Sequence, residues 1–311
     1  MPSLNEIQTM SEGIVIQRAC PVCEETANEP FLIKLELRLV RCHQCSMVYV
    51  NPVPAEMATG DFYDRAGSEY LSPEKLESDY AEVRFERELR LFREHCRSGS
   101  VLDVGCSSGG FLYQLQKRFP GEYKILGTDV SQAPLDHAMK MGVPVIRGEF
   151  LKQSLAEKFD AVTFWAVMEH LAAPGLFLQK AAEVLKPGGY CFMLTPNLKS
   201  LAVRLIGAKY RYIFPEHLNY FTAETMRTFV EREFTVTGMM STHFNPLVIW
   251  QDFCGGERDI PRAERIKLLK RTTGYKQSRW LWPVKTGYRA TEALLSRLML
   301  ADNVAAVGRK K

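Results

Sequence analysis

Four cysteines in two pairs form the clearest metal-ligating pattern in the sequence. Cys20 and Cys23 make one Cys-x-x-Cys pair, and Cys42 and Cys45 make a second one after an intervening segment. Two such pairs fit a zinc ribbon, in which each pair supplies two thiolates to one tetrahedral ion. Because four thiolates leave no open coordination position, we expect a structural Zn²⁺ and no metal catalysis.

Two features leave this metal assignment open. A turn of this kind usually has glycine directly after its second cysteine, and here Glu24 and Ser46 stand there. His43 could replace a thiolate, although four cysteines are already available. The alternative is therefore a ribbon that has lost its metal and keeps free thiols.

A second group of residues could bind a nucleoside. A short apolar strand at 101–104 leads into a turn with Gly105, Gly109 and Gly110, and a helix follows. Glycines let the backbone approach a ligand, and the first N–H groups of a helix are unpaired. The next strand ends at Asp129, whose carboxylate suits a pair of ribose hydroxyls. The G-x-G-x-x-G fingerprint is absent, which argues against NAD and for another nucleoside.

Four segments between Asp103 and Asn197, in this order, resemble class I S-adenosylmethionine-dependent methyltransferases: DVGCSSGGF, GTDVS, FDAVTFWAVMEHL and LKPGGYCFMLTPN. The alternative is a dehydrogenase-like domain with chance similarities. The resemblance implies S-adenosyl-L-methionine as cofactor. The residues that it assigns to the cofactor site are Asp103, Gly105, Cys106, Gly109, Asp129, Val130, Glu149, Phe150 and Trp165.

The same resemblance gives some of these residues a role. Glu149 would accept a hydrogen bond from the adenine amino group, Phe150 would flank the adenine ring, and Trp165 would lie near the sulfonium. Helices that precede the first strand would fold over the cofactor as a lid. Phe62 and Tyr63, in that part of the chain, could contact the ligands or belong to the core.

Methyl transfer from a sulfonium is an in-line displacement, so the protein mainly positions the reactants. A base is needed when the acceptor is an alcohol, and an imidazole near pKa ~6.5 can take the proton at neutral pH. His217 and His170 are the candidates. His217 lies where the resembled enzymes carry substrate-facing residues, and its alternative role is a bond to nearby backbone. His170 could instead be structural, as we expect for His243.

Strands and helices that alternate after residue 98 predict an α/β fold. We expect a doubly wound, Rossmann-like sheet of seven strands, the last of them antiparallel, with a small N-terminal zinc ribbon. The predicted divisions are a ribbon at 1–55, a helical lid or linker at 56–98, and a methyltransferase domain at 99–311 with a basic helical insertion at about 251–300. The alternating segment at 31–41 predicts one strand of the ribbon. The charged stretch at 73–96 predicts a helix that begins at Pro73.

Charge is nearly balanced over the chain but uneven along it. There are 40 basic and 36 acidic residues, while residues 251–311 carry 14 basic against 6 acidic ones. This basic segment could be a solvated face with a helix on the sheet, a site for a phosphorylated or nucleotide-linked substrate, or a peripheral contact with an anionic membrane. No apolar run spans a bilayer, no signal peptide is evident, and the cysteine pattern indicates a reducing compartment, so we expect a cytoplasmic protein.

These observations favour a methyltransferase for a small-molecule or glycan/nucleotide-sugar acceptor, acting on a hydroxyl oxygen. Two alternatives stay open, an RNA methyltransferase with a zinc module and a non-catalytic S-adenosylmethionine-binding protein. A net charge of +4 is modest for a nucleic-acid binder. The sequence does not indicate the oligomeric state.

Overall fold

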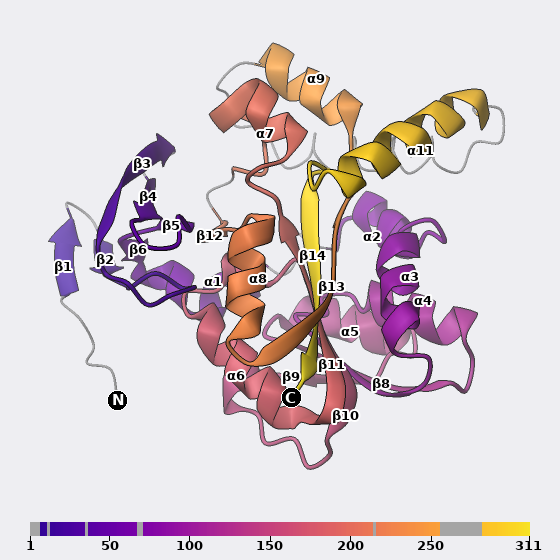
Figure 1. The fold of residues 1–311 in the computed structure, drawn as a ribbon. Coiled ribbons are helices and arrows are strands. Elements are labelled where there is room, and N and C mark those ends of the chain that lie inside the picture. Colours follow the sequence, from indigo (N-terminus) through magenta and orange to yellow (C-terminus); the bar gives the residue numbers. More distant parts are fainter. Residues whose placement is uncertain (1–6, 11–12, 35–36, 67–70, 214–215, 256–281) are drawn as a thin grey trace.

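The structure is a computed structural model that describes residues 7–10, 13–34, 37–66, 71–213, 216–255 and 282–311. A seven-stranded sheet forms its centre, and the N-terminal ribbon lies at one side (Figure 1). No helix within these ranges combines the length and the apolar character that crossing a bilayer requires.

The central sheet has the strand order β13-β14-β11-β10-β7-β8-β9. Its strands are β7 (Gly99–Val104), β8 (Tyr123–Asp129), β9 (Val145–Arg147), β10 (Phe159–Trp165), β11 (Leu185–Pro196), β13 (Phe234–Thr242) and β14 (Asn303–Lys310). Strands β7 to β11 pair in parallel, and β14 is antiparallel to both β11 and β13. The predicted doubly wound sheet with an antiparallel last strand is confirmed.

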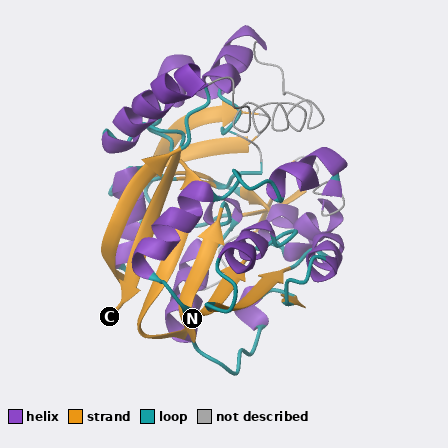
Figure 2. Ribbon diagram, turned by 90° about the vertical axis from the view of Figure 1, so that its right-hand side faces the viewer, coloured by secondary structure: helices purple, strands orange, loops and turns teal. Residues whose placement is uncertain are grey.

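Alternation along the strands divides the core into two layers. On β11, Cys191 and Met193 face a cluster with α6 (Pro174–Val184) and α8 (Ala223–Glu231), whereas Phe192 and Leu194 belong to a second cluster. That second cluster contains α3 (Glu86–His95), α4 (Gly110–Arg118) and α5 (Gln132–Lys140). Helices therefore cover both faces of the sheet (Figure 2), as expected where both sides of parallel strands are apolar.

The N-terminal ribbon forms two small sheets, and a strand from a later part of the chain completes one of them. One contains β1 (Ile7–Met10), β2 (Gly13–Ile16) and β6 (Val53–Pro54); the other contains β3 (Asn28–Lys34), β4 (Leu37–Cys42), β5 (Val48–Val50) and β12 (Asn219–Tyr220). The prediction of one strand across 31–41 was wrong, because the segment forms the β3–β4 hairpin. Alternation continues through both strands, so the pattern alone did not reveal the turn.

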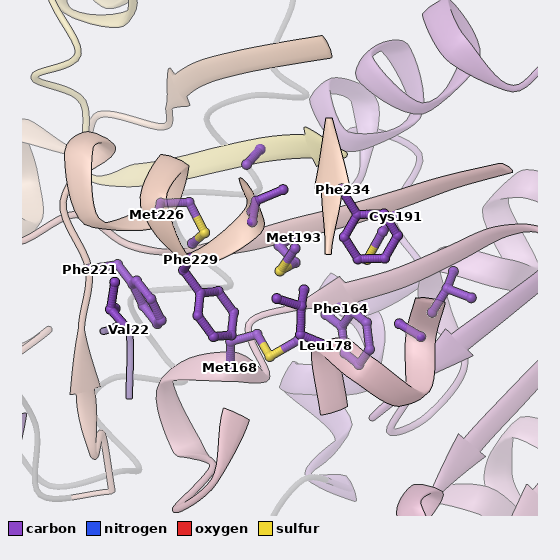
Figure 3. Packing of buried hydrophobic residues seen from close by; sticks show 14 of the residues in the cluster. Val22, Phe164, Met168, Leu178, Cys191, Met193, Phe221, Met226, Phe229 and Phe234 are labelled. Carbon is purple, nitrogen blue, oxygen red and sulfur yellow. The ribbon is translucent and has the colours of Figure 1, made fainter. Parts of the chain in front are cut away.

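The ribbon shares its core with the rest of the protein. Val22 is 2% exposed and belongs to the same cluster as Phe221 and Phe229, and Figure 3 shows Val22 beside Phe221. Strand β12 also comes from the chain that follows β11, yet it pairs with β5 of the ribbon. The ribbon is therefore held by both apolar contacts and backbone hydrogen bonds.

The segment before the central sheet is helical but interrupted. It contains η1 (Ala55–Ala58), α1 (Gly60–Ala66), α2 (Pro73–Asp79) and α3. Helix α2 begins as predicted, with the Ser72 hydroxyl accepting a hydrogen bond from the N–H of Lys75. The single helix expected at 73–96 was wrong, because the chain turns after Tyr80. The Tyr80 hydroxyl donates to Ser108 O, and Gln114 Nε2 donates to Tyr80 O, so tertiary contacts hold this turn.

The remaining described helices lie between or after the strands along the chain. They are η3 (Phe150–Lys152), η4 (Met168–His170), α7 (Leu201–Ile206), η5 (Gly207–Lys209), α9 (Pro246–Gly255) and α11 (Trp282–Arg297). The buried carboxylate of Asp252 in α9 binds the guanidinium of Arg211, with Nε at 2.9 Å from Oδ1. Helix α11 precedes β14 and contacts β13. Most of the expected basic insertion, 256–281, lies outside the described residues.

One buried carboxyl group in η4 should make the stability of the fold depend on pH. Glu169 is 1% exposed, and its Oε2 has no hydrogen-bond partner within the described part of the chain. Burial raises the pKa of Glu169 to about 8. The folded protein therefore binds this proton more tightly than the unfolded chain does.

We expect this group to stabilise the fold fully below pH ~4.3 and to lose that contribution as the pH rises toward 8. Glu169→Gln should remove part of the loss, at most about 1.4 kcal/mol per pH unit. Urea unfolding of both proteins at pH 6 and pH 8.5 measures it, with the exposed Glu94→Gln on α3 as control. An unchanged pH dependence in Glu169→Gln would contradict the assignment.

Candidate active site

The turn after β7 has the backbone conformation that its glycines allow. Gly105 and Gly109 have φ of 72° and 78°, and Ser107 between them also has a positive φ, 48°. A Cβ on Gly105 would lie 2.6 Å from Cγ2 of Val167. Gly109 is the N-cap of α4, so the first turn of that helix begins at this loop. The predicted strand, turn and helix are thus present, with bare backbone at the carboxyl end of β7.

Asp129 at the end of β8 connects this turn with the next one. Its Oδ2 accepts a hydrogen bond from the N–H of Ser107, and its Oδ1 accepts one from the N–H of Ser131, both at 2.9 Å. Burial raises the pKa of the Asp129 carboxyl, and the two backbone N–H groups act in the opposite direction. Each oxygen can accept a further hydrogen bond, so the carboxylate can still bind a diol.

Helix α1 covers the end of β8. The Ser131 hydroxyl donates to the carbonyl of Tyr63, and the N–H of Gln132 donates to Oδ1 of Asp64. A Cβ on Gly60 would lie 3.1 Å from Cγ1 of Val130. The predicted site residue Val130 therefore lies where α1 approaches the sheet.

The side chains of two other predicted site residues make their contacts mainly within the sheet itself. Asp103 is 3% exposed and accepts a hydrogen bond from the Thr163 hydroxyl at 2.6 Å, which connects β7 with β10. Burial raises the pKa of Asp103 to about 7. Cys106 is buried, and burial raises the pKa of its thiol. A Cβ on Gly127 would lie 2.6 Å from this Sγ, so the thiol fills space left by the glycine.

Of the two predicted site residues after β9, Glu149 lies at the surface and Phe150 lies in the core. Glu149 is partly exposed and forms an ion pair with Lys152 at 2.7 Å. Phe150 is 3% exposed and packs against Phe164 and Phe177 in the core. That Phe150 flanks a bound ring stays a prediction, and in the structure its ring belongs to the core.

Trp165, at the end of β10, keeps an unused donor. Its ring packs against Phe111 and Phe192. Its Nε1 is buried and has no hydrogen-bond partner among the residues that the structure describes. The next residue, Ala166, is exposed with φ of 58°, so the chain turns sharply away from the strand here. A buried indole N–H normally finds an acceptor, which makes this strand end a place for a polar ligand.

The structure brings the two predicted histidines together. The rings of His170 and His217 are 4.8 Å apart between centroids and nearly perpendicular. The Nδ1 of His170 lies 3.0 Å from Glu216 O, and the Nδ1 of His217 lies 3.0 Å from Tyr212 O. Because a carbonyl oxygen can only accept, each Nδ1 carries a proton. Burial lowers the pKa of His170 to about 4, so its ring is neutral at pH 7.

A buried pair that the sequence did not indicate lies at the end of β13. His243 Nε2 is 2.8 Å from Oε1 of Glu88 on α3. Burial opposes ionisation of Glu88, but the hydrogen bond and charge of His243 outweigh it and lower the pKa of Glu88 to about 2. His243 has φ of 62°. Its structural role was predicted, whereas its partner lies 155 residues away and no local pattern identifies it.

The four cysteines of the ribbon form one cluster. Their Sγ atoms lie within 4.8 Å of one another, with Cys20–Cys45 and Cys23–Cys42 each at 3.4 Å. Glu24 and Ser46, which stand where glycine is usual, have φ of 64° and 62°. Both Cys-x-x-Cys turns therefore adopt the left-handed backbone conformation that usually favours glycine, although the residues there carry side chains. The donor set and its spacing fit one tetrahedral ion.

Comparison with known proteins gives a family. The family model described as a methyltransferase domain matches residues 76–234, just over half of the chain. The chain is 34% identical over 164 residues to a protein of Caulobacter vibrioides, covering 48% of this chain and 64% of that protein. It is 38% identical over 119 residues to one of Chelativorans sp., covering 35% of this chain and 46% of that protein. Both relatives are named ubiquinone biosynthesis O-methyltransferase. The chain thus spans about half to two thirds of their length.

Solved structures show the same fold at low identity. An S-adenosylmethionine-dependent methyltransferase of Thermotoga maritima, described as a possible histamine N-methyltransferase, superimposes with a TM-score of 0.53 at 18% identity, over 82% of this chain and all of that one. The cyclase SpnF gives 0.53 at 16% identity, over 83% and 98%. The predicted family is confirmed: the chain belongs to the methyltransferase-domain family, and its sheet has the fold of S-adenosylmethionine-dependent methyltransferases.

Proposed function

We propose that the chain is an S-adenosylmethionine-dependent methyltransferase that methylates a hydroxyl oxygen of a small-molecule or glycan acceptor. The observation that carries this proposal is the position of the His217–His170 pair. His170 follows β10 and His217 follows β11, so the pair lies beyond the carboxyl ends of the parallel strands, as do Asp129 and the turn after β7. Parallel strands bring their carboxyl ends together at one edge, where ligands of such sheets bind.

The residues present fit the cofactor. The backbone at Gly105 and Gly109 leaves room for close approach, and Asp129 offers the carboxylate that a ribose diol requires. Glu149, Phe150 and Trp165 stay in the proposed set. When bound, S-adenosylmethionine supplies an electrophilic methyl group.

The protein's own contribution is orientation and proton removal. His217 is held in place by its Nδ1 bond to Tyr212 O, and we assign its imidazole as the group that takes the acceptor's hydroxyl proton. Tyr63 fixes the backbone beside His170, since its hydroxyl donates to His170 O at 2.9 Å. The names of the relatives, both O-methyltransferases, support an oxygen acceptor.

The cysteine cluster fits Zn²⁺, and we propose a structural role for it. Four thiolates would complete a tetrahedral shell and leave no position for a substrate. The eight cysteines, all free thiols in this structure, also support our proposal of a reducing, cytoplasmic setting.

Loss of the Asp129 carboxylate should weaken cofactor binding. Asp129→Asn keeps the shape but has one acceptor oxygen instead of two, so we expect affinity for S-adenosylhomocysteine to fall at least tenfold, about 1.4 kcal/mol. Isothermal calorimetry measures it, with Asp136→Asn on α5 as control. Equal affinity of Asp129→Asn and the native protein would remove Asp129 from the site.

Replacing His217 should stop the chemistry without affecting the cofactor. We expect His217→Gln to lower turnover of a phenolic or sugar hydroxyl acceptor by about 10² or more, because general-base catalysis contributes that much. S-adenosylhomocysteine release and calorimetry separate turnover from binding. His95→Gln is the matched control, since His95 Nδ1 also bonds a backbone carbonyl, that of Leu91. Retained turnover in His217→Gln would exclude His217 as base.

The native protein should contain one Zn²⁺ per chain. A strong chelator should remove it and lower the melting temperature, because a structural metal contributes to folding. Elemental analysis and thermal melting measure both effects, with Cys42→Ser as the variant and the exposed Cys254→Ser as control. A native protein without bound metal, or one whose stability is unchanged by metal removal, would contradict the proposal.

A further inference from the structure

Arg18 lies between β2 and the first cysteine pair, and its guanidinium reaches out of the ribbon. Its Nε donates to the carbonyl of Val50 at 3.0 Å, and its Nη2 donates to that of Leu218 at 2.6 Å. Its Nη1 donates to the carbonyl of Ala172 at 2.9 Å and to Oδ1 of Asn219 at 3.0 Å. One planar group thus connects three segments that are far apart in the sequence.

Each acceptor outside the ribbon belongs to a segment that carries a histidine of the active site. Ala172 follows His170 by two residues, and Leu218 follows His217 directly. Asn219 joins the same two segments, because its Nδ2 donates to Met168 O at 2.8 Å and to Leu171 O at 2.7 Å. The two histidine segments are therefore fastened to each other and to Arg18.

The ribbon backbone reinforces this connection. The N–H of Val50 donates to Leu218 O at 2.9 Å, so this carbonyl accepts from both the ribbon backbone and Arg18. Strand β12, which begins at Asn219, continues the pairing with β5. A ring displaced by about 1 Å can lose a large part of its catalytic effect.

We propose that Arg18 is a positioning residue that holds the His170 and His217 segments in the geometry needed for proton removal, and that the ribbon supports the acceptor side of the active site in this way. The catalytic part of this inference rests on the proposed function, whereas the geometric part does not. The planar shape of the guanidinium is important, because its Nε, Nη1 and Nη2 donate in different directions to four acceptors at once.

Arg232 offers a matched control at the same interface. It follows α8, and its Nη1 donates to the carbonyls of Pro21 and Val22 at 3.2 Å, while its Nη2 pairs with Glu24. Arg232 therefore also connects the ribbon to the rest of the protein, through the first cysteine turn. Replacing it tests ribbon docking without removing a bond to the histidine segments.

The experiment compares Arg18→Met, Arg18→Lys and Arg232→Met with the native protein. The six histidines are followed by ¹H–¹³C NMR of their rings and assigned with single His→Gln variants. We expect Arg18→Met to shift the His170 and His217 signals and leave that of His95 in place, and Arg232→Met to leave all three in place. Arg18→Lys keeps the charge without the fork and should restore the signals only in part. It also serves if Arg18→Met does not fold.

Kinetics give the second measurement. We expect kcat to fall at least tenfold in Arg18→Met, with unchanged affinity for S-adenosylhomocysteine, and to stay within twofold in Arg232→Met. Equal effects of the two methionine variants, or unmoved His170 and His217 signals in folded Arg18 variants, would overturn the proposal. Native protein without methyltransferase activity would overturn the proposed function only, because the NMR comparison needs no acceptor.

Discussion

The two hydrogen bonds that Asp129 accepts are the constraint on which the nucleotide side of the site depends. Both oxygens bind backbone N–H groups, one in the turn after β7 and one in the turn after β8. The carboxylate thereby fixes two loops whose strands are neighbours in the sheet. A ligand that binds this carboxylate meets a site that is already ordered, which lowers the entropy lost on binding.

At the strand ends the sequence predicted the local structure, while the binding roles of these residues stay predictions. Gly105, Gly109 and Asp129 were found because each lies at a fixed place in a strand–turn–helix unit, and parallel pairing then dictates that such places meet. His217 was found through its neighbourhood in the chain, and its nearness to His170 follows from the same edge of the sheet. Local pattern and topology were sufficient for these residues.

Contacts between distant segments could not be predicted in this way. No periodicity shows that β12 pairs with the ribbon, that Arg18 reaches Leu218, or that Glu88 meets His243, since each pair is joined only in the folded chain. The interruption between α2 and α3 has the same origin, because the chain turns at Tyr80, whose hydroxyl binds the turn after β7. Phe150 shows another limit of local pattern, because its ring contacts with Phe164 and Phe177 come from segments distant in the sequence.

The common core of the ribbon and α8 has a consequence for how such a chain can be shortened or recombined. Val22 covers Phe221, and β5 supplies the partner strand of β12. A truncated chain that starts after the ribbon would expose aromatic side chains to water. It would also leave the backbone carbonyls of two segments without the hydrogen-bond donors that the ribbon supplies. Exchange of the N-terminal ribbon between homologues should therefore give a folded protein only when α8 and β12 are exchanged with it, so the three have to evolve together.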